Sequence, residues 1–182
     1  FTFLSVPGLK CHGAVYGVTA ATKHHMGTMT TGLSTGAHTG VRYGGMGRFL
    51  ADVRMPDLNI LDCIYILAQP SAGPSASYSQ ATRVDKLVAG KDPIALDMWA
   101  TTNILVPTIL ANGYTSYPKQ DPTNPSSIFR TYLDAAMNVL LTAGTNVTND
   151  LSKVDAHEMN AAEVGQPQVD HAALAVPNPT RS

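Results

Sequence analysis

The sequence LKCHGAVYGVTAATKHHMG, residues 9–27, decides the fold and holds the densest group of reactive side chains in the chain. It contains two lysines, three histidines, two threonines and one of the two cysteines. The apolar run before it, residues 1–6, predicts a buried strand. We therefore expect the stretch to leave the end of a strand and enter a helix, where ligands bind in open α/β sheets. The sequence predicts a site here but does not define a reaction.

Length and composition set the broad class of the protein. A chain of 182 residues with 44% apolar and 14% charged residues fits one folded domain. The formal net charge is −1 and no block of Lys or Arg occurs, so we expect no nucleic-acid binding. No uninterrupted apolar run approaches the roughly 18 residues of a membrane-spanning helix, so we expect no membrane span.

The beginning of the chain and its cysteines leave the compartment open. The sequence starts at Phe1, which suggests either a processed product or part of something longer. A strand at residue 1 suggests sheet partners upstream, so the domain is expected to lack N-terminal elements. Cys11 and Cys63 fit small buried side chains better than reactive thiols. We expect a soluble chain, with export after processing as one alternative and with the oligomeric state undetermined.

Periodicity predicts the elements of the first half. Apolar residues at helical spacing predict a helix over 15–26 that ends at Gly27. The Gly- and Thr-rich segment 28–45 predicts a loop, and residues 46–53 follow the pattern of an amphipathic helix. The nearly continuous apolar run 58–67 predicts a strand covered on both faces.

Caps and turn residues organise the second half. Residues 84–89 predict a strand, and Asp92 followed by Pro93 predicts the start of a helix. Residues 106–125 are predicted to be irregular, and 128–143 to form a helix that Ser126 or Ser127 caps. The alternation of elements predicts an α/β fold, a mainly parallel sheet with flanking helices. We place the domain at 1–144 and a polar C-terminal extension at 145–182.

Five sequence blocks then occur in a recognisable order over residues 1–105. They read VPGLKCHGAVYGVTAATKHHMG, a loop with His38, PDLNILDCIYI, a Gly-Pro pair and LVAGKDPIALD. In order and spacing they resemble the DUF362 family, whose usual form contains "lpklKtH", "gvTlalKNlmG", "ivDai" and "agkDpvAvDa". The chain departs from that form where His24 and His25 follow Lys23.

The resemblance implies a fold and a site more than a reaction, because the family has no well-established general activity. Members are often joined to ferredoxin-type iron–sulfur modules, and some carry export signals, which implies a redox context and an iron–sulfur protein partner. This chain has two cysteines and no CxxC run, so it holds no four-cysteine cluster itself. The family's motif positions fall on Lys10, His12, Thr19, Lys23, Asp62, Asp92 and Asp97.

An anion site is the first chemical hypothesis for these residues. Lys10 and Lys23, beside helical amides, would form a pocket for a carboxylate or phosphate. We add Thr19 and Arg42 as ligand-binding candidates. The alternative is that both lysines reach solvent or pair with acidic side chains.

Acid–base chemistry is the second hypothesis. Asp62 interrupts an apolar strand and is either a general base or a structural partner of loop amides. We name His12 and Asp97 as further catalytic candidates, because each occupies a motif position. Asp92 fits a helix cap better than a catalytic role.

A metal site is the third hypothesis. Neutral imidazoles of His12, His25 and His38 could ligate a divalent transition metal, although no established zinc spacing occurs. Taken together, the sequence predicts a domain that binds a small anionic ligand or a metal–ligand complex in a Lys/His/Asp cleft. The alternative from a different class is a non-catalytic structural or interaction subunit of a larger assembly.

Overall fold

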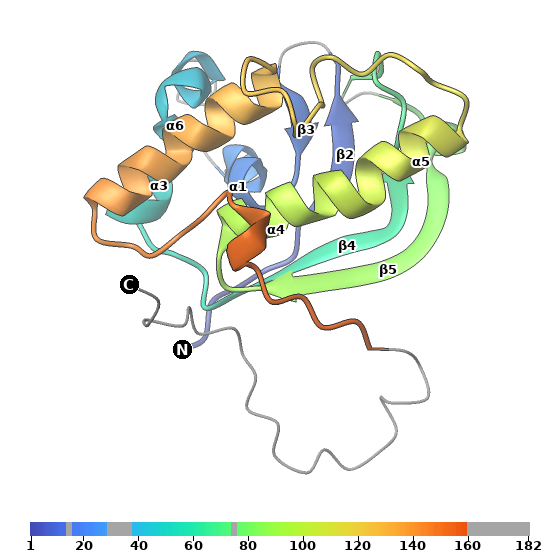
Figure 1. Ribbon diagram of the computed structural model, residues 1–182. Coiled ribbons are helices and arrows are strands. Elements are labelled where there is room, and N and C mark those ends of the chain that lie inside the picture. Colours follow the sequence, from blue (N-terminus) through green and yellow to red (C-terminus); the bar gives the residue numbers. More distant parts are fainter. Residues whose placement is uncertain (14–15, 29–37, 74–75, 160–182) are drawn as a thin grey trace.

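One mixed sheet forms the base of the molecule. The computed structural model describes residues 1–13, 16–28, 38–73 and 76–159 (Figure 1). Within them the central strand β4 pairs in parallel with β1 and β2 and antiparallel with β5, while β3 pairs antiparallel with β2. Three of these five strands run in one direction and helices pack against the sheet, so the predicted α/β class is confirmed. The strands are β1 (Leu4–Ser5), β2 (Gly8–His12), β3 (Gly17–Thr19), β4 (Leu58–Leu67) and β5 (Thr82–Gly90).

Strand β4 has the predicted bounds but not the predicted environment. Its residues alternate, with Leu61 and Cys63 fully buried while Ile64 is exposed. Leu87, the β5 neighbour of Asp62 across the open face, is 64% exposed. Figure 1 shows the helices gathered over one face of the sheet. The expectation that both faces of β4 are covered is therefore wrong within the described residues.

The stretch 9–27 folds as a hairpin before it becomes helical. Strands β2 and β3 pair Cys11 with Val18 and His12 with Gly17, so the predicted helix over 15–26 is wrong in its first half. Gly17 adopts φ +75°, and a Cβ there would lie 2.0 Å from the carbonyl oxygen of Lys119. Only glycine fits this close approach, and it fixes the turn into β3.

A short helix closes the stretch. Helix α1 (Ala21–His24) continues into a 3₁₀ turn, His25–Thr28. The predicted single strand over 1–6 is also shorter than expected, because only β1 pairs and Pro7 follows it without an amide donor. Half of the predicted loop over 28–45, residues 29–37, lies outside the described residues. In the other half Val41–Tyr43 forms a 3₁₀ turn and a helix begins at Gly45, so the loop prediction is wrong there.

Two helices with the predicted patterns pack against each other. They are α3 (Gly45–Asp52) and α6 (Ile128–Thr142). Ser127 caps α6 by accepting a hydrogen bond from the Arg130 amide at 3.2 Å. A Cβ on Gly47 would lie 2.3 Å from the carbonyl oxygen of Ala136, so glycine permits the close packing of α3 on α6.

The helix that begins at Pro93 extends further than predicted. Asp92 caps α4 (Pro93–Ala100) by accepting from the amides of Ile94 and Ala95, as predicted. A π-helical turn, Thr101–Leu105, then leads into α5 (Val106–Ala111). The wider turn accommodates Pro107, which would break a regular α-helix. The prediction of irregular structure from residue 106 is therefore wrong for its first turn and a half.

This combined helix also bears on the membrane expectation. Among the described residues, Pro93–Ala111 is the one helix long and apolar enough to cross a membrane by length and composition. Of its most apolar 18-residue stretch, 56% is buried inside the fold. Core helices of soluble proteins pass the same test, so the expectation of no membrane span stays a prediction.

The beginning of the predicted C-terminal extension is attached to the body. Val147 joins the core, and the Thr148 amide donates to Asp92 Oδ2 at 2.7 Å. A 3₁₀ turn, Leu151–Lys153, follows, and Leu151 packs against the same core. Residues 160–182 lie outside the described residues.

Candidate functional site

The hairpin and the helix after it bring four motif side chains together. Lys10 on β2 stands opposite Thr19 on β3 in the antiparallel register. After the effect of burial, the charges of Lys23 on α1 and of Lys10 both lower the pKa of His12. The charge of Lys10 likewise lowers the pKa of Lys23. We call Lys10, His12, Thr19 and Lys23 the Lys–His cluster. All four were predicted as site residues from the sequence.

Lys23 is the most unusual member of the Lys–His cluster. The residue is only 4% exposed, and its ammonium nitrogen lies 4.8 Å from the ring centroid of Tyr16. Burial, and then the charge of Lys10, lower the pKa of Lys23 to about 8. Among the described residues, neither lysine of the cluster forms an ion pair. A buried ammonium without a counter-ion is costly, so this position favours an anion.

Two polar atoms of the cluster also lack partners. His12 Nδ1 and Thr19 Oγ1 are buried and have no hydrogen-bond partner within the described part of the chain. Burial, followed by the charge of Lys23, lowers the pKa of His12 to about 4, so its imidazole is neutral at pH 7. Buried polar groups are nearly always hydrogen-bonded in folded proteins. These two atoms are therefore exceptions within the described residues, and both belong to the cluster.

An aromatic side chain that the sequence analysis did not select supports the cluster. The Tyr16 ring lies 5.4 Å from the His12 ring and 6.0 Å from the His38 ring, centroid to centroid. Its hydroxyl donates to the carbonyl of His38. Arg42 is exposed and lowers the pKa of Tyr16, against the larger effect of burial. The charge of the predicted ligand residue Arg42 thus acts on Tyr16, and its role as a ligand residue stays a prediction. No sequence signal distinguishes Tyr16 from other tyrosines.

Asp97 holds the helix that carries Lys23. Its carboxylate is fully buried and accepts from the amides of Ala21 at 2.7 Å and Thr22 at 2.9 Å. The N-cap residue of α1, Ala20, provides no side-chain cap, so Asp97 caps this helix from a distant part of the sequence. Burial raises the pKa of Asp97 to about 7, while these hydrogen bonds oppose the rise. The geometry makes Asp97 a positioning residue, with both oxygens occupied.

The other two motif aspartates are also engaged with backbone amides. Asp62 is half-buried, and its Oδ1 accepts from the Ile64 amide at 2.9 Å. Its charge is not among those that shift the pKa of Lys23 or His12. The hydrogen bond fits the structural interpretation of Asp62, and the general-base role stays a prediction. Asp92 acts as the predicted cap.

The three histidines of the metal hypothesis lie in different surroundings. His25 packs between Phe3 and Phe49, with ring centroids 6.1 and 5.6 Å away, whereas His12 and His38 flank Tyr16. Burial lowers the pKa of His25 to about 4. Within the described ranges, no group of three His, Cys, Asp or Glu side chains is placed to hold a metal ion. The geometry gives the metal hypothesis no support.

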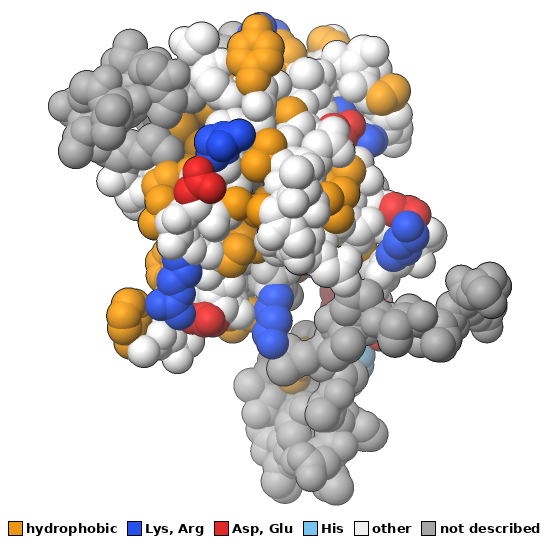
Figure 2. Space-filling model, turned by 90° about the vertical axis from the view of Figure 1, so that its left-hand side faces the viewer, with side chains coloured by type: hydrophobic (Ala, Val, Ile, Leu, Met, Phe, Trp, Pro, Cys, Tyr) orange, Lys and Arg blue, Asp and Glu red, His pale blue; other side chains and the backbone are white. Residues whose placement is uncertain are grey.

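Cations on the surface contrast with Lys23. Figure 2 shows Lys and Arg side chains of one face lying mostly beside Asp or Glu rather than in a basic patch. Five such pairs occur in the described residues, with N···O distances of 2.7 to 3.7 Å. Surface pairs of this kind contribute little to stability. Lys23 differs from the five paired cations because it is buried and has no such partner in the described structure.

Fold and site together define an α/β domain with a buried cationic cluster at a hairpin and the helix after it. The chain belongs to the DUF362 family: the family model, described as a domain of unknown function, matches residues 2–102. The match confirms the resemblance and spans every residue of the Lys–His cluster together with Asp97. No curated protein and no solved structure shows significant similarity to the chain.

Proposed function

We propose that this domain binds a small oxyanion, a carboxylate or a phosphate group, at the Lys–His cluster. The observation that carries the proposal is the buried ammonium of Lys23, which has no counter-ion among the described residues. Lys10 adds a second positive charge beside it. Charge-assisted hydrogen bonds to an oxyanion would offset the cost of burying this charge.

The uncharged members of the cluster suit the same ligand. The Thr19 hydroxyl and the His12 imidazole can each donate to an anionic oxygen, and both have vacant positions. Asp97 supports the site indirectly, because it fixes the first turn of α1, which carries Lys23. If the ligand is transformed there, His12 is the group placed to move a proton, since its imidazole is neutral and adjacent to both lysines.

Titration calorimetry with inorganic phosphate and with acetate at pH 7 tests the proposal. We expect saturable binding of at least one anion by the unmodified chain, and at least a tenfold loss in Lys23→Met. Lys153→Met is the matched control, because that side chain is exposed and pairs with Asp150. Absence of binding to both anions, or equal affinity in Lys23→Met and the unmodified chain, would overturn the proposal.

The interaction-subunit alternative has one supporting observation. The sheet face away from the helices exposes apolar side chains, and Leu4, Val6, Ile64 and Leu87 are each at least 40% exposed. Sedimentation velocity over a range of concentrations tests it: a stable oligomer would favour a role in assembly, and a monomer would not. A metal–ligand complex, a redox context and an iron–sulfur partner stay predictions from the sequence.

A further inference from the structure

The two lysines of the Lys–His cluster have different surroundings. Lys10 is half-buried on β2, where it stands opposite Thr19. Lys23 is 4% exposed, and the Tyr16 ring lies 4.8 Å from its nitrogen. The first acidic residue in the sequence is Asp52, so neither the hairpin nor α1 has a carboxylate of its own to pair with either lysine. The two amines are therefore suited to different tasks.

Lys23 has the surroundings of a nucleophilic amine. Nucleophilic lysines lie in apolar surroundings or beside another cation, because both conditions favour the neutral amine, whose lone pair can attack a carbonyl carbon. Lys23 meets both conditions. Burial, and then the charge of Lys10, lower its pKa to about 8, so about a tenth of the amine is neutral at pH 7. Lys23 can therefore react with a carbonyl group as well as attract an anion.

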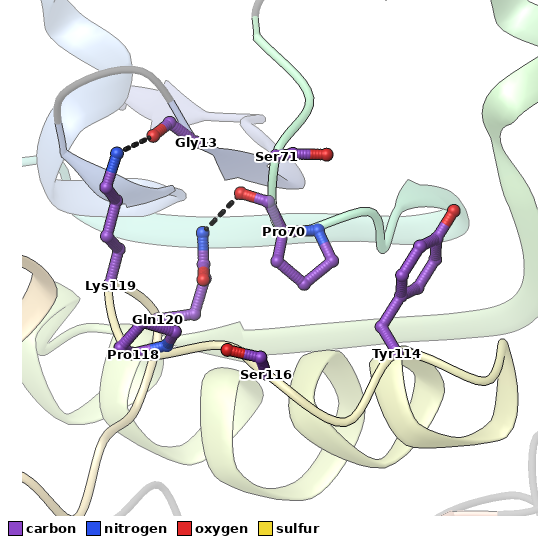
Figure 3. Close-up of a pocket in the computed structure, with 8 residues that line it drawn as sticks. All are labelled: Gly13, Pro70, Ser71, Tyr114, Ser116, Pro118, Lys119 and Gln120. Atoms are coloured by element: carbon purple, nitrogen blue, oxygen red, sulfur yellow. Dashed lines mark hydrogen bonds between the residues drawn. The ribbon is translucent and has the colours of Figure 1, made fainter.

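Another lysine of the chain shows the contrast. Lys119 lies in the pocket drawn in Figure 3 and donates a hydrogen bond to the carbonyl of Gly13. Gln120 beside it donates to the carbonyl of Pro70 at 3.1 Å, so both side chains join the end of the hairpin to the neighbouring loops. No member of the Lys–His cluster lines this pocket. Lys119 thus has a structural task, whereas Lys23 faces an aromatic ring.

We propose that the bound anion is a 2-oxo acid, and that Lys23 forms a Schiff base with its keto carbon while Lys10 and Thr19 hold its carboxylate. This inference rests on the proposed function and adds to it the substrate class and a covalent step. A 2-oxo acid carries its carboxylate directly on the keto carbon, so one small molecule presents an anion and a carbonyl group side by side. The Thr19 hydroxyl is buried without a partner in the described residues and can donate to that carboxylate.

The step balances without an oxidant or a reductant. The lone pair of the neutral Lys23 nitrogen attacks the keto carbon, a C–N bond forms, and the electron pair of the C=O double bond moves to the oxygen. The C–O bond then breaks, and the oxygen leaves as water with the two protons that the amine gives up. His12 is the group placed to carry these protons, because its imidazole is buried, neutral at pH 7 and subject to the charges of both lysines.

Trapping with pyruvate and sodium cyanoborohydride tests the inference on the unmodified chain. The borohydride reduces a Schiff base to a stable amine, so the labelled lysine gains the mass of pyruvic acid less one oxygen atom, and peptide mapping by mass spectrometry locates it. We expect labelling at Lys23 to exceed labelling at Lys153, an exposed lysine in the same sample.

Methyl pyruvate is the matched probe, because it has the same ketone and no negative charge. The ratio of labelling at Lys23 to labelling at Lys153 should be about tenfold higher with pyruvate, since one charge-assisted hydrogen bond provides a difference of this size. Lys10→Met should remove this preference for pyruvate. Lys86→Met, which changes an exposed lysine paired with Glu158, should retain it.

Lys23→Arg separates the covalent step from anion binding. The guanidinium keeps the positive charge but does not lose its proton, so this variant should bind phosphate and form no adduct at position 23. Equal labelling of Lys23 and Lys153 by pyruvate, in a chain whose phosphate binding depends on Lys23, would overturn the Schiff base and leave the oxyanion site in place. Labelling of Lys23 that does not distinguish pyruvate from methyl pyruvate would overturn the 2-oxo acid. Failure to bind phosphate and acetate, together with no excess labelling of Lys23, would overturn both proposals.

Discussion

The acidic and the basic residues at the motif positions of this domain differ in whether the fold gives them hydrogen-bond or charge partners. Asp62, Asp92 and Asp97 each accept hydrogen bonds from backbone amides, at distances of 2.7 to 3.1 Å. Lys23 is as buried as a core residue and forms no ion pair in the described structure, and His12 Nδ1 has no partner there. The carboxylates are therefore satisfied within the fold, whereas the bases of the cluster are not, and we propose that a ligand supplies their missing partners.

The difference follows from what each group needs when it is buried. A carboxylate can be satisfied by backbone amides, which every chain has in excess at helix N-termini. An ammonium needs acceptors, and the buried site of Lys23 presents a tyrosine ring and another lysine instead. A buried base left in this state weakens the fold, and we interpret that cost as the requirement of a binding site.

The largest effect should come from Asp97→Ala. The change leaves the buried amides of Ala21 and Thr22 without an acceptor, and we expect a loss of about 3 kcal/mol in the free energy of unfolding. Urea titration monitored by circular dichroism measures it. The affinity for phosphate should fall as well, because the helix that carries Lys23 loses its cap.

Asp150→Ala is the control for that experiment. Asp150 also accepts from a backbone amide, that of Ser152 at 3.0 Å, but on the exposed surface. We expect its loss to change the free energy of unfolding much less than Asp97→Ala does, because water can replace an exposed hydrogen bond. Equal losses in the two variants would contradict the assignment of Asp97 as the cap of α1.

Lys23→Met should change stability in the other direction. The lowering of the Lys23 pKa from 10.5 to about 8 represents about 3 kcal/mol at 1.36 kcal/mol per unit, so removing the charge should stabilise the free protein by about 2 kcal/mol at pH 7. A less stable variant would mean that Lys23 has a structural partner. Urea titration at pH 7 distinguishes the two results.

The same residue gives a pH dependence of defined sign. Between about pH 8 and 10.5 the folded chain has released the Lys23 proton while the unfolded chain retains it, so stability should rise with pH across this window. Lys23→Met should lack the rise. Sulfate, whose charge is constant here, should bind the unmodified chain less tightly as the pH increases above about 8. A flat sulfate profile would exclude Lys23 from the site.

A smaller effect is expected from His12 in mild acid. Its folded pKa of about 4 lies below the ordinary 6.5, so the stability present above pH 6.5 is lost as the pH falls toward 4. Between pH 6.5 and 5 this contribution is about 1.5 kcal/mol. Asp97 has a raised pKa and contributes with the opposite sign, so the difference between the unmodified chain and His12→Gln is the quantity to measure. The exposed His157→Gln is the control, and equal curves for the two variants would contradict the prediction.

Local signals predicted the elements that local forces determine. The bounds of β4, the helices at α3 and α6 and the start of α4 at Asp92 all follow from periodicity and caps. The hairpin could not be separated from a helix, because Val15, Val18 and Thr22 fit helical spacing and the deciding contact of Gly17 lies about 100 residues away at Lys119. The helix through Pro107 depends on a π turn that no sequence pattern indicated.

The candidate site likewise has residues that a local stretch of sequence predicts and residues whose roles depend on contacts made only in the folded chain. Lys10, His12, Thr19 and Lys23 could be selected together because one short stretch of sequence contains them all. The task of Asp97 could not be inferred, since its partners lie 75 and 76 residues away. Tyr16 was missed for a different reason: it lies close to His12 in the sequence, but no pattern shows that the hairpin brings the two rings to 5.4 Å.

The smallest expected effect, from Asp62→Asn, is the sharpest test of the contrast between acids and bases. Asparagine keeps an Oδ1 that can accept from the Ile64 amide, so the free energy of unfolding should change by less than about 0.5 kcal/mol. Phosphate affinity should stay within twofold of the unmodified chain, whereas Lys23→Met in the same titration loses at least tenfold. A large loss of affinity in Asp62→Asn would place a motif acid at the ligand. In that case the separation of structural acids from binding bases would not hold.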